Sequence, residues 1–326
     1  MTTHRERIEA CLSGARLDRT PIALWRHFPV DDQTPETLAA ATLEWQKNYD
    51  WDLVKVTPSS SFALKDWGAV DEWRGDTEGT RRYIRRVITS LDDWGKLNVL
   101  DADSPHLAAQ LKCLSILRSE LGTSIPLVQT VYSPLAQAKN LAGGDVLLAH
   151  LRMRPDLVGR GLEIIAESTR RFIRAARAHG LVDGIFYAVQ HAQAQLLSKE
   201  EFVEFGRSYD LLTLESARPL WLNILHLHGV NVYFQSVADY PAQIINWHDR
   251  ETPPSLSDAL PRTHMVPCGG ISRETIVYGT MNDVSTEVAN AIEQVHGNPV
   301  IIGTGCVLPV IASHGNLVAA RTSVEI

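Results

Sequence analysis

Short apolar runs alternate with longer amphipathic runs along most of this chain. Eight of the short runs have the length and the apolar, often β-branched content of buried strands. They lie at residues 22–25, 53–56, 126–131, 184–189, 221–227, 243–247, 264–268 and 299–303. Most segments between them carry apolar residues at helical spacing, most clearly at 36–47, 106–120, 156–178, 199–217, 284–295 and 316–323.

This alternation predicts the α/β class and, more specifically, a single (β/α)8 TIM barrel that spans residues 1–326. Ser198 and Ser272 supply N-cap signals for two of the helices. Residues 81–90 alternate weakly, which indicates an inserted hairpin. A doubly wound open sheet is the alternative, but no glycine-rich dinucleotide loop follows an early strand.

Polar side chains gather where the predicted strands end. Seven of the eight strand ends carry such groups: Arg26 and His27, Thr57, Tyr132, Gln190 and His191, His226 and His228, His248 and Asp249, and Cys306. Barrel enzymes place their chemistry at the C-terminal ends of the strands. We therefore expect these side chains to surround one active site.

His226, His228 and Cys306 form the most specific group. Residues two apart in an extended segment point the same way, so both imidazoles can face one site. Two imidazoles and a thiolate with an open fourth position match a catalytic zinc site. The alternative is that the histidines hydrogen-bond the substrate and that Cys306 only packs.

The neighbouring strand ends offer groups for proton transfer. His248 can act as an acid, a base or a fourth metal ligand, and Asp249 can orient an imidazole. The alternative is a structural turn in which Asp249 caps a backbone group and pairs with Arg250. Gln190 and His191 are candidates for substrate contact and proton handling, although a purely structural histidine explains His191 equally well.

The remaining candidates concern substrate binding. The guanidinium of Arg26 matches a carboxylate or phosphate, with a structural ion pair as the alternative. Tyr132 is a candidate pocket residue, whereas Lys139 is expected to be a solvated helix residue. The sequence contains no P-loop, dinucleotide fingerprint or Gly-x-Ser-x-Gly elbow, which argues against ATP, NAD or serine hydrolase chemistry.

Composition narrows the class of protein further. The chain has 326 residues, of which 44% are hydrophobic, so it can bury a large core. The formal net charge is -7 without a basic run, so no nucleic-acid partner or membrane surface is expected. No apolar run approaches about 18 residues, and the polar N-terminus resembles a helix start more than a signal peptide. Four cysteines without close pairing suit a reducing compartment, and we expect a cytoplasmic protein.

Several segments, taken in order, resemble the uroporphyrinogen decarboxylase superfamily over nearly the whole chain. They are Asp18-Arg-Thr-Pro21-Ile22, Gly184-Ile185, Leu197-Ser-Lys-Glu-Glu-Phe202, Gly269-Gly270-Ile271, Gly279-Thr280, Ile302-Gly-Thr-Gly-Cys-Val-Leu-Pro309 and Asn316-Leu317. The resemblance implies a (β/α)8 barrel with a deep cleft at the C-terminal strand ends. It also implies one of two chemistries: cofactor-free decarboxylation of a porphyrinogen, or zinc-dependent methyl transfer between a corrinoid and a thiol.

The decarboxylase branch matches this chain poorly. Arg26 matches the first of that branch's paired arginines, but Val30 stands where the second is expected. Residues 57–62 contain no acid at the place of that branch's aspartate, and Gly305 stands at the place of its histidine. Most of the groups that would hold a carboxylated tetrapyrrole are therefore missing.

The methyltransferase branch, which carries a His-x-Cys pair and a final cysteine as zinc ligands, is more similar. His226 and Cys306 match, and His228 replaces the middle cysteine. Such a site has one sulfur ligand fewer and is a stronger Lewis acid, so it could activate water or an oxygen-containing acceptor in place of a thiol.

The resemblance thus favours a zinc-dependent methyltransferase that moves a methyl group between a corrinoid and a small acceptor. The corrinoid would arrive free or on a separate corrinoid protein, and the family implies a homodimer. One alternative is a metal-independent decarboxylase that acts on a porphyrinogen-like or other carboxylated substrate. The other is a non-catalytic protein that binds a corrinoid or tetrapyrrole.

Overall fold

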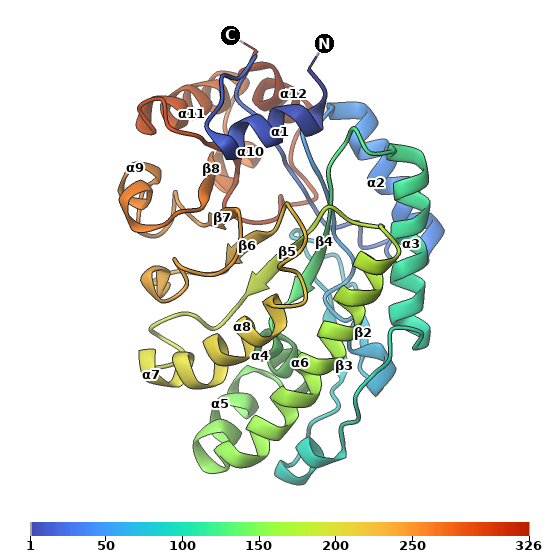
Figure 1. Cartoon of the computed structure of the whole chain (residues 1–326). Helices are drawn as coiled ribbons and strands as arrows, with labels where there is room; N and C mark the ends of the chain where they lie inside the picture. Colours follow the sequence, from blue (N-terminus) through green and yellow to red (C-terminus); the bar gives the residue numbers. More distant parts are fainter. Residues whose placement is uncertain (1, 326) are drawn as a thin grey trace.

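A computed structural model describes residues 2–325 of the chain. Its main feature is a curled sheet of seven strands in which every neighbouring pair is parallel (Figure 1). In spatial order the strands are β1 (Val54–Val56), β4 (Leu127–Tyr132), β5 (Gly184–Val189), β6 (Ile224–Leu227), β7 (Ile244–Trp247), β8 (Val266–Ile271) and β9 (Ile301–Thr304). These strands confirm seven of the eight predicted runs and the α/β class.

The predicted first strand, residues 22–25, is not a strand in the structure. Its backbone makes only isolated parallel bridges, between Ile22 and Ile302 and between Arg26 and Leu308. This segment runs beside β9, where an eighth strand of a barrel would lie. The predicted eight-stranded barrel is therefore confirmed only as a curled parallel sheet of seven strands.

In residues 22–25, side chains bond the backbone groups that would otherwise pair with a neighbouring strand. The Ile22 N–H donates to Oδ2 of Asp52 at 2.8 Å. The Leu24 carbonyl accepts a hydrogen bond from Nε1 of Trp45 at 3.0 Å. Both backbone groups are satisfied without a neighbouring strand, so the segment stays extended but does not pair regularly.

Helices surround the sheet, most of them on its outside (Figure 1). They are α1 (His4–Ser13), α2 (Pro35–Tyr49), α3 (Pro105–Leu121), α4 (Pro134–Ala142), α5 (Gly144–Met153), α6 (Pro155–Ala178), α7 (Lys199–Phe202), α8 (Ser208–Leu214), α9 (Leu256–Ala259), α10 (Arg273–Tyr278), α11 (Met281–Gln294) and α12 (His314–Thr322). The single helix predicted at 199–217 is divided by a π-helical turn, Val203–Arg207. Gly206 in that turn lets the Phe202 ring lie against the backbone, where a Cβ atom would collide at 2.6 Å.

A small antiparallel hairpin extends from the main sheet, formed by β2 (Val70–Glu72) and β3 (Arg82–Arg85). It confirms the inserted hairpin expected near 81–90. Residues just before, within and just after β3 reach the cavity described below. The insertion therefore contributes to the site as well as to the surface.

Side chains alternate along each strand between the inside of the curled sheet and the surrounding helices. The inner cluster collects one or two apolar residues from most strands, together with two from α1: Ile8, Cys11, Ala23, Trp25, Leu53, Val128, Phe186, Leu222, Ile224, Ile244, Cys268 and Ile301. Adjacent strand residues such as Leu127, Leu225 and Ile245 belong to the larger cluster beneath the helices. This alternation determines which side chains point into the interior of the curled sheet.

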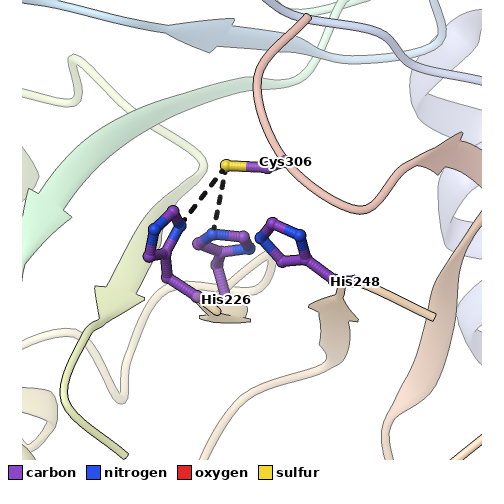
Figure 2. A group of neighbouring side chains, drawn as sticks. His226, His248 and Cys306 are labelled. Atoms are coloured by element: carbon purple, nitrogen blue, oxygen red, sulfur yellow. Dashed lines mark hydrogen bonds between the residues drawn. The ribbon is translucent and has the colours of Figure 1, made fainter. Parts of the chain in front are cut away.

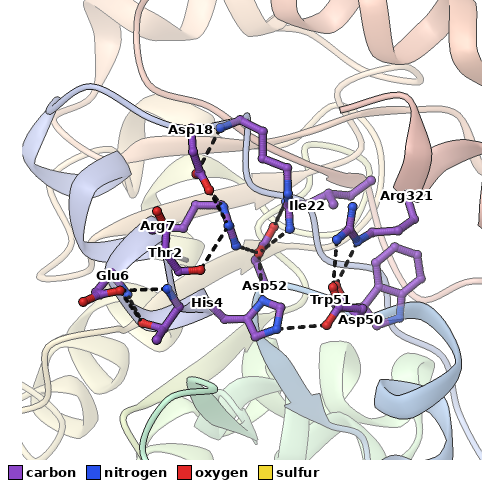
Figure 3. A network of polar contacts seen from close by, with 12 residues as sticks. Thr2, His4, Glu6, Arg7, Asp18, Ile22, Asp50, Trp51, Asp52 and Arg321 are labelled. Atoms are coloured by element: carbon purple, nitrogen blue, oxygen red, sulfur yellow. Dashed lines mark hydrogen bonds and ion pairs between the residues drawn. The ribbon is translucent and has the colours of Figure 1, made fainter. Parts of the chain in front are cut away.

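Charged groups join α1 to the start of β1 around the buried carboxylate of Asp52 (Figure 3). Its oxygens accept hydrogen bonds from Arg7 at 2.7 Å and from Arg19 at 2.6 and 2.9 Å. Nδ1 of His4 lies 3.0 Å from the same carboxylate. Arg7 also pairs with Asp18 at 2.7 Å. The network fixes the N-terminal helix against the segment that replaces the eighth strand.

Within residues 2–325, no helix is both long enough and apolar enough to cross a bilayer.

Candidate metal centre

The neighbouring strands β6 and β7 place polar side chains in the interior of the curled sheet, near the C-terminal ends of the strands. His226 follows the inward Ile224 by two residues, so it continues the inward row of β6. The register pairs His226 with Asn246 on β7. Three more side chains lie just past the ends of β6, β7 and β9, namely His228, His248 and Cys306.

Four of these side chains converge on one point. His226, His228, His248 and Cys306 each offer one ligand atom, and all four atoms lie within 4.8 Å of one another. Sγ of Cys306 lies 3.6 Å from Nε2 of His226 and 3.6 Å from Nδ1 of His228. Figure 2 shows the rings of His226 and His248 directed toward the sulfur. The structure thus brings together the three predicted ligands and adds His248 as a fourth.

A buried amide fixes the orientation of the His226 ring. Nδ2 of Asn246 donates to the carbonyls of Cys268 at 2.8 Å and Thr304 at 3.0 Å. Its Oδ1 is therefore left as the acceptor for Nδ1–H of His226 at 2.7 Å. With the proton on Nδ1, the lone pair of Nε2 points to the cluster, as a metal ligand requires.

His248 has a similar arrangement on the other side of the cluster. Its Nδ1 lies 3.1 Å from Oε2 of Glu251, so a carboxylate fixes this nitrogen as the donor. Its Nε2 is buried and has no hydrogen-bond partner among residues 2–325. An unsatisfied buried nitrogen next to a thiol and two imidazoles is the arrangement that a bound cation would complete.

The electrostatics of the cluster favour a thiolate. Burial alone would raise the pKa of Cys306, but the imidazoles of His226, His228 and His248 lower it well below the usual range. Burial lowers the pKa of His226, against the opposing effect of Cys306. Burial also opposes protonation of His248, but Cys306 and Glu251 raise its pKa. Zinc accepts this combination of a thiolate and imidazole nitrogens, so the residues present fit that metal.

The cluster opens into a cavity of about 560 Å³. Tyr132 and Gln190, two of the predicted substrate-binding residues, line it, as do His226, His228 and Cys306. The inward rows of β4 and β5 explain these positions, because Tyr132 lies four residues after Val128 and Gln190 lies four after Phe186. Tyr132 and Gln190 are therefore placed to contact a ligand, although their roles stay predictions.

Besides His248, which belongs to the four-donor cluster, three predicted site residues lie outside the cavity lining. Arg26 places its guanidinium 5.2 Å from the Phe28 ring and 5.0 Å from the Trp45 ring. Asp249 accepts the Gly270 N–H at 3.0 Å and so contacts the β8 backbone. His191 is buried with a φ of 69°. Their predicted roles in anion binding and proton transfer gain no support from these positions.

The sequence prediction missed five residues that matter to the site. Asn246 and Glu251 orient the two histidines, and Lys55, Arg86 and Lys139 are three of the five lysine and arginine residues that line the cavity. The expectation that Lys139 is a solvated helix residue is wrong, because α4 turns it toward the cavity. Lys55 could have been found, since a lysine inside the apolar run Leu53–Val56 is unusual for a buried strand.

Replacing Asn246 with alanine should lower the affinity for zinc by about 10- to 100-fold, because His226 loses the partner that fixes its Nδ1 proton. A competition titration with a chromogenic chelator measures this. Asn316→Ala is the matched control, because Asn316 also donates to two backbone carbonyls, of Ile276 and Gly279. Equal zinc affinity in the two variants would contradict the role given to Asn246.

Comparisons with known proteins agree with the fold. The family model described as uroporphyrinogen decarboxylase (URO-D) matches residues 3–325. No curated protein matches the chain. A solved methyltransferase from Methanosarcina mazei superposes with a TM-score of 0.86 at 18% identity, covering 100% of this chain and 99% of that one.

A second solved structure is more distant. It is a B12-independent methionine synthase from Shewanella sp. W3-18-1 in complex with selenomethionine, with a TM-score of 0.59 and 14% identity over 94% of this chain and 92% of that one. At such identities both structures establish the fold and not the reaction. The family match, in contrast, extends over almost the entire sequence, and the chain therefore belongs to the uroporphyrinogen decarboxylase family.

Proposed function

We propose that this protein is a zinc-dependent methyltransferase that moves a methyl group between a corrinoid and a small acceptor. The observation that carries the proposal is the convergence of three imidazoles and one thiol, of which His226, His228 and Cys306 line a cavity. His226, His228 and Cys306 would hold the metal. A methyltransferase from Methanosarcina mazei has the same fold, so the fold is compatible with this reaction class.

His248 gives the site its fourth group. A catalytic zinc site keeps one position for the substrate, whereas a closed set of four protein ligands is typical of structural zinc. His248 would fill that position in the resting enzyme and yield it to the acceptor. Its Nε2 has no other partner among the described residues, and its Nδ1 contacts Glu251, so it can then take the proton that the acceptor loses.

Zinc, when bound, supplies Lewis acidity that lowers the pKa of a thiol or hydroxyl acceptor. The protein's own contribution is to hold the donors rigidly and to keep water away. Asn246 fixes the His226 ring, and the side chains of His226 and Cys306 are almost fully buried. The corrinoid would be supplied by a separate protein or in free form.

Metal analysis of the purified protein tests the proposal most directly. We expect close to one zinc per chain, lost on treatment with a strong chelator and regained on adding zinc. Methyl transfer from methylcobalamin to a thiol or hydroxyl acceptor should fall and recover in parallel. A natively folded protein without zinc, or turnover that is insensitive to the chelator, would refute the mechanism.

A metal-independent decarboxylase is the second candidate, and the charge of the cavity favours it. Lys55, Arg86 and Lys139 line the cavity and would suit a carboxylated substrate. This function predicts release of CO₂ by chelator-treated enzyme. It leaves the four-donor cluster without a role, which is why it ranks second.

A further inference from the structure

One part of the cavity carries cations that have no carboxylate partner within residues 2–325. We call Lys55, Arg86 and Lys139 the basic wall; they come from β1, from the residue after β3 and from α4, and all three line the cavity. None of them forms an ion pair with a described residue. The wall therefore contributes positive charge that the protein itself does not neutralise.

Arg86 and Lys139 are neighbours on this wall. Nη1 of Arg86 donates to the carbonyls of Lys139 at 3.3 Å and Asn140 at 2.7 Å. The guanidinium also lies 5.0 Å from the Tyr83 ring. These contacts fix Arg86 beside the α4 backbone, so the guanidinium and the Lys139 ammonium face the same cavity.

The other charged residues of the lining do not balance the wall, and the exposed Arg82 adds a further cation that has no ion-pair partner among residues 2–325. Arg81 pairs with Asp32 at 2.7 Å and so is already neutralised. Glu78, the one acidic residue in the lining, pairs with Arg273. Even with the thiolate of Cys306, which also lines it, the cavity is therefore electropositive.

Two like charges in a partly buried cavity are unfavourable without a counter-ion. Burial, and then the charge of Arg86, lowers the pKa of Lys139 to about 8. Buried charges in proteins are normally paired, because removing a charge from water costs on the order of several kcal/mol. Here the missing partner fits in the cavity, which has room for an organic ligand.

The rest of the lining indicates what that ligand looks like. Trp25, Tyr83, Tyr132 and Phe186 all border the cavity. The ammonium of Lys55 lies 4.5 Å from the Phe186 ring, so cation and aromatic surface alternate. Aromatic walls favour a flat apolar body, and the basic wall favours an acidic group attached to it.

We propose that the cavity binds a small aromatic anion, such as an aromatic carboxylate, with its acidic group on Lys139 and Arg86. This inference deepens the proposed function, and it rests on that function only for the role of the anion as the methyl-transfer substrate. The anion subsite itself depends on the basic wall and not on the metal.

Calorimetric titration with benzoate tests the subsite, with benzamide as the uncharged molecule of the same shape and inorganic phosphate as an anion without a ring. Benzoate should bind at least about tenfold more tightly than either. Lys139→Met should weaken benzoate binding about tenfold, whereas Lys139→Arg should retain it. Lys112→Met is the matched control, because Lys112 lies outside the lining with its side chain 62% exposed.

The thermal midpoint shows whether the variant is folded. Lys139→Met should unfold at the same or a higher temperature than the wild type without ligand, because it removes an unpaired charge from a desolvated place. The difference should shrink as the pH rises above 8, since Lys139 of the folded wild type then loses its proton while the unfolded chain keeps it to about pH 10.4.

Each outcome decides the proposal. Equal affinity for benzoate and benzamide, or unchanged benzoate affinity in Lys139→Met, would overturn it; phosphate binding as tight as benzoate would overturn the aromatic part. Repeating the titration with metal-free protein separates the two proposals. If the native protein binds benzoate but contains no zinc, the anion subsite is supported and the methyltransferase proposal is refuted. If the protein contains zinc but does not bind benzoate, the anion subsite is refuted and the metal site is supported.

Discussion

Replacing Cys306 with alanine should remove zinc from the protein and lower methyl transfer by about a thousandfold or more, equivalent to about 4 kcal/mol of transition-state stabilisation. Cys306 supplies the one sulfur and the one anionic donor among the four groups of the cluster. Its sulfur lies 3.6 Å from both His226 and His228, so the variant leaves imidazoles without the soft ligand between them.

Cys113→Ala is the matched control for this variant. Cys113 is also buried, but it lies in α3 within the outer core, where burial raises its pKa to about 12. Both alanine variants lose one buried sulfur, so both should lose a similar amount of stability when each is compared with the wild type in the absence of zinc. Zinc content and turnover should fall in Cys306→Ala alone; a zinc content that stays near one per chain there would rule out Cys306 as a ligand.

The three residues predicted as metal ligands lie close together, and strand periodicity alone was enough to group them. A strand alternates with a period of two, so His226 and His228 had to share a side. Cys306 follows the last apolar run, and neighbouring parallel strands end on the same edge of a sheet. These rules require no knowledge of register.

The supporting residues could not be predicted in the same way. Asn246 matters because the register places it opposite His226, and no local pattern fixes that register. The sequence offered His248 as an acid, a base or a fourth ligand, and its place in the cluster follows from the position of β7 next to β6. Lys139 was expected on a helix but exposed to solvent; almost every residue of α4 is buried, so a lysine on this helix faces the cavity and not the surface.

The failure at residues 22–25 has a different origin. The apolar pattern there is correct, and the segment is buried and extended beside β9. It is not a strand, because Asp52 and Trp45 occupy backbone groups that a neighbour would otherwise bond. A carboxylate 30 positions away in the sequence thus overrides a local β preference.

Asp52→Asn should lower the free energy of unfolding by about 3 to 5 kcal/mol, the second large effect that we expect. The amide keeps the shape of the side chain and can still accept the Ile22 N–H. However, the substitution removes the negative charge that faces Arg7 and Arg19. The asparagine side chain also has one acceptor oxygen, where the carboxylate has two. Arg19 then has no carboxylate partner among the described residues.

Urea denaturation at neutral pH measures the loss. Asp50→Asn is the matched control: its carboxylate is 61% exposed and contacts His4 and Arg321, so the change should cost less than about 1 kcal/mol. Asparagine also tolerates the left-handed backbone of that position, where φ is 54°. Equal losses in the two variants would show that burial of the Asp52 charge does not matter.

The dependence on pH gives an independent check. Although burial opposes it, bonding to His4 and Arg19 lowers the pKa of Asp52, and Arg7 lowers that of Asp18 to about 2. A lowered carboxyl pKa adds stability above its unfolded value, near pH 3.9, that is lost as the pH falls through the folded value. The stability of the wild type should therefore fall from about pH 4 toward pH 2, more steeply than that of Asp52→Asn. Residues 22–25 also place Trp25 in the cavity lining. Asp52→Asn should therefore bind zinc and benzoate under conditions in which it stays folded, and should lose both only where it unfolds.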